Sequence, residues 1–309
     1  MQRMKVLVTG GAGFIGSHIV DLLLSEGHEV AVIDSLIHGK MENLNPAAQF
    51  HQIDIRDKAV RKVFEDFRPE VLIHEAAQIK VPNSIKDPIY DAEVNILGTL
   101  NLLEACREFK VRKVIYPATA AMFSEPQYLP IDELHPLSMM SGYGVSKHVV
   151  EHYLEVYNKL YGIDYTVFRY SNVYGPRQDS TGEGGVVAIF CETMIKGVVP
   201  EIYGDGTQTR DFIYVKDVAK ANVVAINGLD NSIYNCCTGV EVSVNELYKT
   251  IAGNLSFHHE PMMKAPREGD IYRTFMTYKK LNDAIGWAPS YDLENGVEET
   301  LNFYRNKRG

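Results

Sequence analysis

The chain contains few cysteines and no long apolar run. Its 4 cysteines are Cys106, Cys191, Cys236 and Cys237. They lack CxxC spacing and have no paired histidines near them in the sequence, so neither a disulfide framework nor a metal site is indicated. A membrane-spanning helix needs about 20 consecutive apolar residues, and the sequence has no such stretch. We therefore expect a cytoplasmic protein with reduced thiols, no bound metal and no membrane partner.

Positive charge is also in deficit. The 31 Lys and Arg residues are outnumbered by 40 Asp and Glu, which gives a formal net charge of −9 and a pI near 5.6. A surface that binds phosphodiesters is basic, so nucleic acid is not an expected partner. The 309 residues, 45% hydrophobic and 23% charged, have the composition of folded domains, which excludes disorder, collagen and coiled coil.

The first half of the chain alternates short apolar runs with longer segments of helical period. The runs predict strands covered on both faces, at residues 5–8, 30–33, 71–73, 113–116 and 165–168. One helical stripe between them consists of Phe14, Ile15, Ile19, Leu22 and Leu23, and another of Val94, Leu97, Leu100 and Leu103. A further helix is expected over 142–161. This order predicts repeated βαβ units around a parallel sheet.

Glycine and proline become denser beyond residue 172, which predicts loops and short elements in the second half. We expect an α/β fold with a Rossmann-type doubly wound parallel sheet over residues 1–172, to which some later segments return. A smaller, interleaved C-terminal lobe is expected over residues 173–309.

A glycine-rich segment follows the first predicted strand and opens the first predicted helix. Gly11, Gly13 and Gly16 satisfy Gly-x-Gly-x-x-Gly, and Gly10, Gly13 and Gly16 satisfy Gly-x-x-Gly-x-x-Gly. Such glycines let the backbone approach a pyrophosphate, which the helix N-terminus binds through free amides. Asp34, at the end of the second predicted strand, can accept hydrogen bonds from both ribose hydroxyls and would repel a 2′-phosphate. The segment predicts dinucleotide binding rather than a purely structural turn, with NAD favoured over NADP.

Tyr143 and Lys147 stand at positions i and i+4 of the helix expected over 142–161, so they share one face. An ordinary exposed pair has the same spacing, but the position after the strand predicted at residues 113–116 of a nucleotide fold favours a catalytic pair. A phenol, whose pKa is about 10, needs a shift of about three units to act as a base near neutral pH. Lys147 and a cationic nicotinamide can supply that shift, and Lys147 can also hold the nicotinamide ribose.

Further motifs follow in order along the chain. In the first half they are Asp54-Ile55, His74-Glu75-Ala76-Ala77 and Asn95. In the second half they are Asn172 within residues 169–177, Gly204-Asp205-Gly206 followed by Arg210-Asp211-Phe212, and Arg267-Glu268-Gly269-Asp270.

Taken together, these residues resemble the extended short-chain dehydrogenase/reductase superfamily, and within it the nucleotide-sugar epimerases, most closely the UDP-glucose 4-epimerases. The resemblance covers almost the whole chain. It implies cofactor contacts at Gly10, Gly13, Phe14, Ile15, Gly16, Asp34, Asp54, Ile55, Ala76, Ala77, Asn95, Tyr143 and Lys147. It implies substrate contacts at Thr119, Asn172, Arg210, Arg267, Asp270 and Thr274. It also implies a homodimer formed through the two long helices of the first domain.

Three departures from the family pattern bear on the site. The catalytic hydroxyl, usually a serine, falls on Thr119, which also carries one hydroxyl donor. Glu75 stands where the family usually has leucine. Residues 139–142 replace the usual Asn/Ser-Pro before the catalytic helix, which is expected to loosen the start of that helix.

The resemblance implies an NAD-dependent isomerase that inverts C4 of a UDP-hexose, UDP-glucose or UDP-galactose, through a 4-keto intermediate. Tyr143, Lys147 and Thr119 are the implied catalytic residues. UDP-N-acetylglucosamine and UDP-glucuronate 4-epimerisation remain alternatives, as does a non-catalytic NAD-binding sensor or scaffold. His74 is interpreted as a packed residue rather than a base, and Cys236-Cys237 as strand core rather than a redox pair.

Overall fold

The computed structural model describes residues 3–181, 185–267 and 271–307. The chain divides into two compact units, each assembled from segments far apart in the sequence. The first unit consists of Met1–Met122, Ser138–Arg169 and Ala219–Tyr234. The second consists of Phe123–Leu137, Tyr170–Val218 and Asn235–Gly309.

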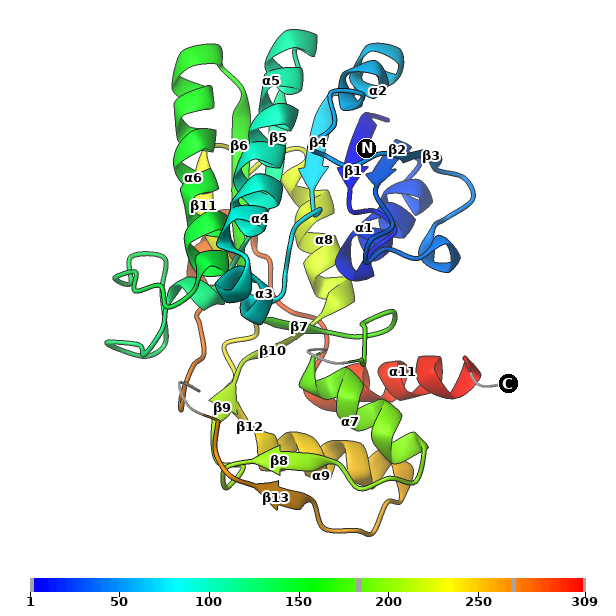
Figure 1. The fold of residues 1–309 in the computed structure, drawn as a ribbon, viewed down its shortest axis with the longest axis vertical. Helices are drawn as coiled ribbons and strands as arrows, with labels where there is room; N and C mark the ends of the chain where they lie inside the picture. The colour runs from blue at the N-terminus through cyan, green and yellow to red at the C-terminus, as the bar shows by residue number, and fades with distance from the viewer. Residues whose placement is uncertain (1–2, 182–184, 268–270, 308–309) are drawn as a thin grey trace. The chain divides into compact units, whose positions relative to one another are not determined.

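The first unit is built around a seven-stranded sheet (Figure 1). The strand order is β11 (Ser232–Cys236), β6 (Asp164–Tyr170), β5 (Lys113–Thr119), β4 (Val71–His74), β1 (Lys5–Thr9), β2 (Glu29–Asp34) and β3 (Gln49–Gln52). The pairs β1–β2, β2–β3, β1–β4 and β4–β5 are parallel. The expected strands are thus confirmed, and their apolar residues form the core, with Val6, Leu7 and Val8 fully buried.

Helices connect the strands in the βαβ manner. They are α1 (Phe14–Ser25), α2 (Val60–Phe67), α3 (Val81–Lys86), α4 (Pro88–Ala92), the π-helical turn η2 (Glu93–Gly98), α5 (Thr99–Phe109), α6 (Gly142–Tyr161) and α8 (Val215–Ala225), with short 3₁₀ turns η1 (Met41–Asn43) and η3 (Ala120–Met122). The helices α5 and α6 lie side by side (Figure 1).

The order of the strands places a switch point between β1 and β4. After β1 the chain builds β2 and β3 on one side, then crosses to build β4 and β5 on the other. Ligands of open α/β sheets bind at such a point, outside the carboxyl ends of the strands. The carboxyl ends here are Thr9 and His74, which pair across the two strands.

The second unit has short strands and three packed helices instead of repeated βαβ units. The strands form the pairs β10 (Phe212–Tyr214) with β7 (Asn172–Tyr174), β12 (Val242–Ser243) with β9 (Thr209–Arg210), and β13 (Met262–Lys264) with β8 (Glu201–Tyr203). The helices α7 (Val186–Ile195), α9 (Val244–Leu255) and α11 (Leu293–Asn306) pack together, and α10 (Lys279–Ile285) is shorter.

The division into units is more interleaved than a boundary at residue 172. Residues 219–234 return to the first unit, and residues 123–137 belong to the second. The second of these segments is held there by backbone pairing, because the Ile131 amide donates to the Phe275 carbonyl at 3.0 Å and the Thr277 amide donates to the Ile131 carbonyl at 2.9 Å.

Candidate functional site

The glycine-rich turn joins β1 to α1 and runs against the segment that follows β4. Gly10 has a φ of 70°, and a Cβ there would lie 2.7 Å from the backbone nitrogen of Ala76. Only glycine fits this position. The N-cap of α1 is Gly13, which has no side chain to occupy the amides of the first turn. Those amides can therefore bind an anion such as a pyrophosphate.

Asp34 ends β2 and fixes the turn from the other side. Its Oδ2 accepts a hydrogen bond from the Ala12 amide at 3.0 Å, and its Oδ1 accepts one from the Leu36 amide at 2.8 Å. Each carboxylate oxygen has two lone pairs, so both retain the capacity to accept a hydroxyl. The geometry is compatible with the predicted ribose contact.

Asp54 and Ile55 lie on the loop after β3. Asp54 accepts hydrogen bonds from Nε of Arg56 at 3.0 Å and Nη2 at 2.7 Å, and this contact lowers the pKa of the carboxyl. Ile55 is buried, and its side chain would lie 2.8 Å from a Cβ placed on Gly98. The structure brings both residues next to η2, and their contact with adenine stays a prediction.

His74 is a packed residue, as interpreted from the sequence. Its Nδ1 lies 2.7 Å from Oγ1 of Thr9 and its Nε2 lies 2.9 Å from Oγ1 of Thr99. Burial lowers the pKa of His74 to about 3, and the charge of Lys147 adds to the effect. Both ring nitrogens are engaged and the low pKa favours the neutral ring, which fits a packed residue. The Ala76 amide donates to the same Thr9 hydroxyl at 3.3 Å, so the Ala76-Ala77 segment borders the glycine turn.

The structure brings Thr119, Tyr143 and Lys147 together in the first unit. Thr119 ends β5, and Tyr143 lies in the first turn of α6, hydrogen-bonded to Thr119. Burial raises the pKa of Tyr143 to about 12, the Thr119 hydroxyl opposes the rise, and the charges of Asp91 and Glu75 add to it. Burial thus dominates the pKa of Tyr143 in the structure, and the lowering expected from Lys147 is not observed.

Lys147 is itself a buried amine. Burial lowers its pKa to about 8, against the charges of Glu75, Asp91 and Glu151. Its Nζ lies 4.2 Å from the centroid of the Tyr116 ring. An amine with this pKa exists in both protonation states near neutral pH, which suits a group that shares a site with a titrating phenol.

Glu75 connects the cluster of Thr119, Tyr143 and Lys147 with the glycine turn. Its backbone packs against Gly10, since a Cβ on that glycine would lie 2.8 Å from the Glu75 carbonyl carbon. Its carboxylate raises the pKa of both Tyr143 and Lys147. Sequence reasoning noted Glu75 only as a departure from leucine and missed this electrostatic role.

Asn95 lies in a buried network beneath the cluster. Its Oδ1 accepts from the Gln78 amide at 2.8 Å, and its Nδ2 donates to Asp91 at 3.2 Å and to Ser146 at 3.0 Å. The network ties η2 to α6 and holds Asp91 near the catalytic residues. The cofactor contact expected of Asn95 stays a prediction.

The start of α6 is firmly capped, contrary to the expected loosening. Ser141 is the N-cap, and its hydroxyl accepts a hydrogen bond from the Gly144 amide at 3.2 Å. Serine is among the preferred N-cap residues, so it replaces the usual start of the helix without loss of a cap. Tyr143 is thus held by a defined first turn.

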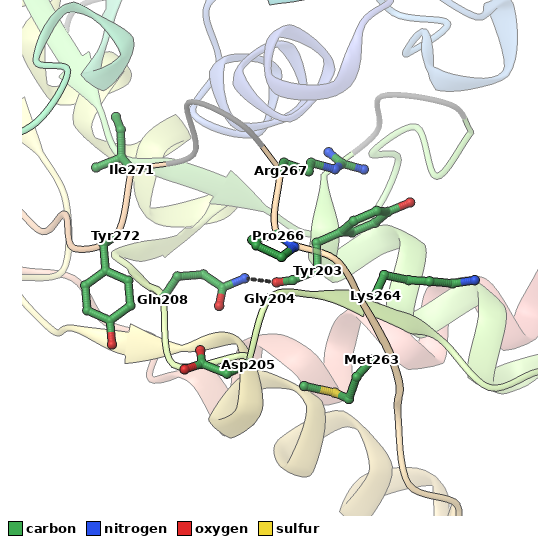
Figure 2. A pocket seen from close by; sticks show the side chains of 10 residues that line it. All are labelled: Tyr203, Gly204, Asp205, Gln208, Met263, Lys264, Pro266, Arg267, Ile271 and Tyr272. Carbon is green, nitrogen blue, oxygen red and sulfur yellow. Dashed lines mark hydrogen bonds between the residues drawn. The ribbon is translucent and has the colours of Figure 1, made fainter.

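The second unit contains a pocket of about 670 Å³ between β8, β13 and the segment that continues from β13 (Figure 2). The guanidinium of Arg267 lies 4.1 Å from the centroid of the Tyr203 ring, and both side chains line the pocket. Tyr272 lies across the pocket from them, and its hydroxyl is 2.8 Å from that of Thr207. A cation beside aromatic rings suits a nucleoside diphosphate, because the rings can contact the base and the cation can pair with a phosphate.

Arg210 supports this pocket from β9. Its Nη1 donates to the carbonyls of Thr209 at 2.8 Å and Ile271 at 2.7 Å, and Ile271 lines the pocket. Asn172 lies nearby on β7, where its Nδ2 donates to the Asp211 carbonyl at 3.2 Å. Their predicted contacts with a diphosphate are untested.

The two remaining residues predicted to contact the substrate are Thr274 and Asp270. Thr274 is half-buried and follows the segment that lines the pocket, without lining it itself. Asp270 lies outside the described residues. A role for either in substrate selection stays a prediction.

Comparison with known proteins identifies the family. Residues 6–237 match the profile of the NAD dependent epimerase/dehydratase family. The chain belongs to this family. The match spans the glycine turn, the Thr119–Tyr143–Lys147 cluster and Arg210, which confirms the resemblance found in the sequence.

Solved structures extend the comparison to the full length of the chain. A Thermotoga maritima UDP-glucose 4-epimerase solved with UDP-glucose has a TM-score of 0.97 and 42% identity, covering 99% of this chain and 100% of that one. A Thermus thermophilus UDP-glucose 4-epimerase in complex with NAD has a TM-score of 0.92 and 44% identity, covering 98% and 99%. A Methanobrevibacter ruminantium UDP-N-acetylglucosamine 4-epimerase in complex with UDP-N-acetylmuramic acid has a TM-score of 0.95 and 35% identity, covering 99% and 100%.

Within 3–181, 185–267 and 271–307, no group of three or more His, Cys, Asp or Glu side chains is placed to hold a metal ion. Across the same ranges, no helix combines the length and apolar character needed to cross a bilayer. All 4 cysteines are buried free thiols, and Cys236 lies in β11, as interpreted from the sequence.

Proposed function

We propose that the chain is an NAD-dependent epimerase that inverts C4 of a UDP-hexose, with UDP-glucose and UDP-galactose as its substrate pair. The observation that carries the proposal is the hydrogen bond between the half-buried Thr119 and Tyr143, with the buried Lys147 one helical turn away. A binding protein has no need of a phenol held in this way, which argues against the non-catalytic alternative.

The residues of the glycine turn fit NAD. Gly10 leaves no room for a side chain between the turn and the backbone of residues 75–76, so the backbone can approach a pyrophosphate closely. The N-cap residue of α1 is Gly13, which has no side chain, so no N-cap side chain occupies the amides at the start of this helix. Asp34 supplies the ribose acceptor. When bound, NAD supplies an acceptor that takes and returns the hydride at C4 of the sugar.

The chain's own residues handle the proton of the 4-hydroxyl. Tyr143 as phenolate accepts this proton, and Thr119 hydrogen-bonds the same sugar oxygen. A cation stabilises a phenolate, so the nicotinamide charge and Lys147 act together against the burial that holds the pKa of Tyr143 high.

Substrate selection rests on the second unit. Inversion requires that the hexose present its other face while the nucleotide stays anchored, and Arg267, Arg210 and Asn172 are the proposed anchors of the diphosphate. Turnover of an N-acetylhexosamine is the second candidate, because the similar Methanobrevibacter protein is a UDP-N-acetylglucosamine 4-epimerase and Thr274 is of moderate size.

The direct test is conversion of UDP-galactose to UDP-glucose by the purified protein, followed by chromatography of the nucleotide sugars. UDP-N-acetylgalactosamine and UDP-galacturonate are assayed alongside. Tyr143→Phe removes the proton acceptor and should reduce turnover at least 100-fold. Tyr153→Phe, on the same helix, is the matched control and should retain activity. If wild type and Tyr143→Phe are equally inert toward all three sugars, the proposal fails.

We also propose that the protein is a homodimer through α5 and α6. The support is a line of exposed apolar side chains at helical spacing on α6, with Val145 46%, Val156 45% and Leu160 65% exposed. Light scattering during size-exclusion chromatography should give twice the chain mass, and Leu160→Glu should shift it toward the monomer. A monomeric wild type would refute the dimer.

A further inference from the structure

Two histidines on α6 lie outside the catalytic cluster and face one another. His148 and His152 stand at positions i and i+4, and their Nε2 atoms are 3.1 Å apart. Two nitrogens bound to one zinc ion at about 2.0–2.1 Å lie roughly 2.9–3.4 Å from each other, for bond angles between about 90° and 109°. The pair is therefore already spaced as two ligands of one ion. We propose that His148 and His152 form a two-histidine chelate for a divalent transition cation of the zinc class.

The surroundings of His148 direct a lone pair toward this position. Its Nδ1 lies 3.0 Å from Oε2 of Glu151, which also receives Nη2 of Arg169 at 2.8 Å, while Oε1 receives Nε at 3.0 Å. A carboxylate only accepts hydrogen bonds, so the neutral His148 ring carries its proton on Nδ1 and has its lone pair on Nε2. In metal sites, a histidine that binds the ion through one ring nitrogen commonly donates the proton of the other nitrogen to a carboxylate.

Glu151 is fixed as a charged acceptor. Its Oε1 and Oε2 each accept a hydrogen bond from the Arg169 guanidinium, and the Arg169 side chain is 5% exposed. The Glu151 side chain is 3% exposed. The His148 ring is thus oriented by a buried ion pair rather than by solvent.

His152 supplies the second nitrogen from an accessible position. In the single chain the residue is exposed and the His148 side chain retains 17% exposure, so a hydrated ion can reach both rings before two copies associate. In the absence of an ion, His152 donates its Nε2 proton to His148, and transfer of that proton to its own Nδ1 frees the nitrogen without a change of charge.

The donor set indicates the class of ion and the coordination. Imidazole nitrogens suit zinc, copper and nickel, whereas magnesium and calcium prefer oxygen. The chain supplies two ligands, because within the described ranges no third His, Cys, Asp or Glu joins them. Water fills the other positions, or the same pair from a second copy does, since His152 lies at helical spacing from Val145 and Val156 on α6.

The test is calorimetric titration of the chelator-treated full-length protein, with NAD present, using zinc sulfate alone, and cobalt chloride alone for the absorption spectrum. Wild type should bind with histidine-type cobalt absorption. His148→Gln and His152→Gln should each weaken zinc binding at least tenfold. Loss of a residue that only hydrogen-bonds to a metal ligand already lowers metal affinity roughly 10–100-fold. His258→Gln, which removes an exposed histidine elsewhere, is the control and should bind as wild type does.

The outcomes separate the site from unspecific binding and from the epimerase proposal. One ion per chain, or one per two chains, supports the site when both variants lose it. Zinc binding that persists in both variants, or no binding by wild type, overturns the proposal. Because the His152 side chain is exposed, His152→Gln should not disturb folding, and circular dichroism verifies that this variant is folded when its zinc binding is measured. The readout does not depend on turnover, so it stands whether or not the protein epimerises a UDP-hexose.

Discussion

The side chain of Thr119 controls how readily Tyr143 loses its proton. The hydrogen bond from Thr119 acts to lower the pKa of Tyr143, while burial raises it. In Thr119→Ala this support is lost, so the pKa of Tyr143 rises and less phenolate is present at a given pH. The acidic limb of the kcat–pH profile should move to higher pH, and kcat at neutral pH should fall about 10–100-fold, the usual worth of a hydrogen bond to a charged group.

Thr119→Ser is the matched control, because it keeps one hydroxyl at the same position. Its pH profile should superimpose on that of wild type. A fall in kcat for Thr119→Ala at unchanged profile would instead mean that the hydroxyl binds substrate without acting on the phenol.

Glu75 acts on the same phenol with the opposite sign. Its charge raises the pKa of both Tyr143 and Lys147. Glu75→Leu restores the residue more usual in the family and removes this charge. The pKa of Tyr143 should then fall, and the acidic limb of the kcat–pH profile should move to lower pH.

Glu93→Leu provides the comparison for that variant. Glu93 is a partly exposed carboxylate of the same unit that contacts Arg56, and it does not act on Tyr143. Its profile should match wild type. If Glu75→Leu also leaves the profile unchanged, or shifts it upward, the assigned role of Glu75 is wrong.

The sequence indicates the proposed catalytic residues more readily than their electrostatic surroundings. Tyr143, Lys147 and Thr119 are recognisable because their spacing and their positions after strands are local features. The effect of Glu75 on Tyr143 arises only when the end of β4 folds against β5 and α6. The N-cap role of Ser141 could have been predicted from the sequence, because serine directly before a helical segment is a known signal for the start of a helix.

Among the elements, the strands and α6 follow directly from the apolar pattern, whereas η2 does not. The stripe containing Val94 and Leu97 was expected on one face, yet Val94 is buried and Leu97 is 58% exposed. The cause is the π-helical turn over Glu93–Gly98, whose wider hydrogen bonding changes which residues share a face. Asn95 is thereby turned into the buried network with Ser146 of α6. Such a turn is selected by tertiary contacts, which a local pattern does not contain.

The ion pair between Glu151 and Arg169 joins α6 to β6 in the interior of the first unit. Both side chains are nearly buried, at 3% and 5% exposure. Arg169→Met leaves the Glu151 carboxylate without its guanidinium and should lower the free energy of unfolding by about 3 kcal/mol, the lower end for breaking a buried pair. Urea denaturation followed by far-UV circular dichroism measures this change.

The same pair gives a pH dependence. The pKa of Glu151 is lower in the folded protein than its ordinary value, so its contribution to stability is complete above the ordinary pKa of glutamate and is lost as the pH falls through the folded value. The stability difference between wild type and Arg169→Met should therefore shrink in acid.

Arg107→Met is the control for the loss of a guanidinium. Arg107 pairs with Glu104 on α5 while 46% exposed, and exposed pairs contribute about 0–1 kcal/mol. A loss in Arg169→Met no larger than in Arg107→Met would show that the buried pair does not stabilise the unit.

At the scale of the whole molecule, the sequence predicts that later segments return to the first unit, but it does not identify which segments the two units exchange. The change in glycine and proline density marks the second lobe, because loops and short elements have a local signature. The assignment of residues 123–137 to that lobe depends on pairing of Ile131 with Met276, far along the chain. Pairing at such a distance is decided by the folded backbone and leaves no periodic trace.

The residues that we assign to the chemical step and those that we assign to substrate binding belong to different units, and this assignment is measurable. Tyr143 and Lys147 belong to the first unit, whereas Arg267 and Tyr203 line the pocket of the second. Arg267→Gln removes a cation that we assign to the diphosphate, an interaction present throughout the reaction, so it should weaken UDP binding and raise KM about 10–100-fold with kcat nearly unchanged. Arg273→Gln is the control. Arg273 follows Arg267 closely in the sequence, pairs with Glu241 and does not line the pocket, so its loss should change neither KM nor kcat. A fall in kcat at constant KM for Arg267→Gln would place this arginine in the chemical step and contradict the division.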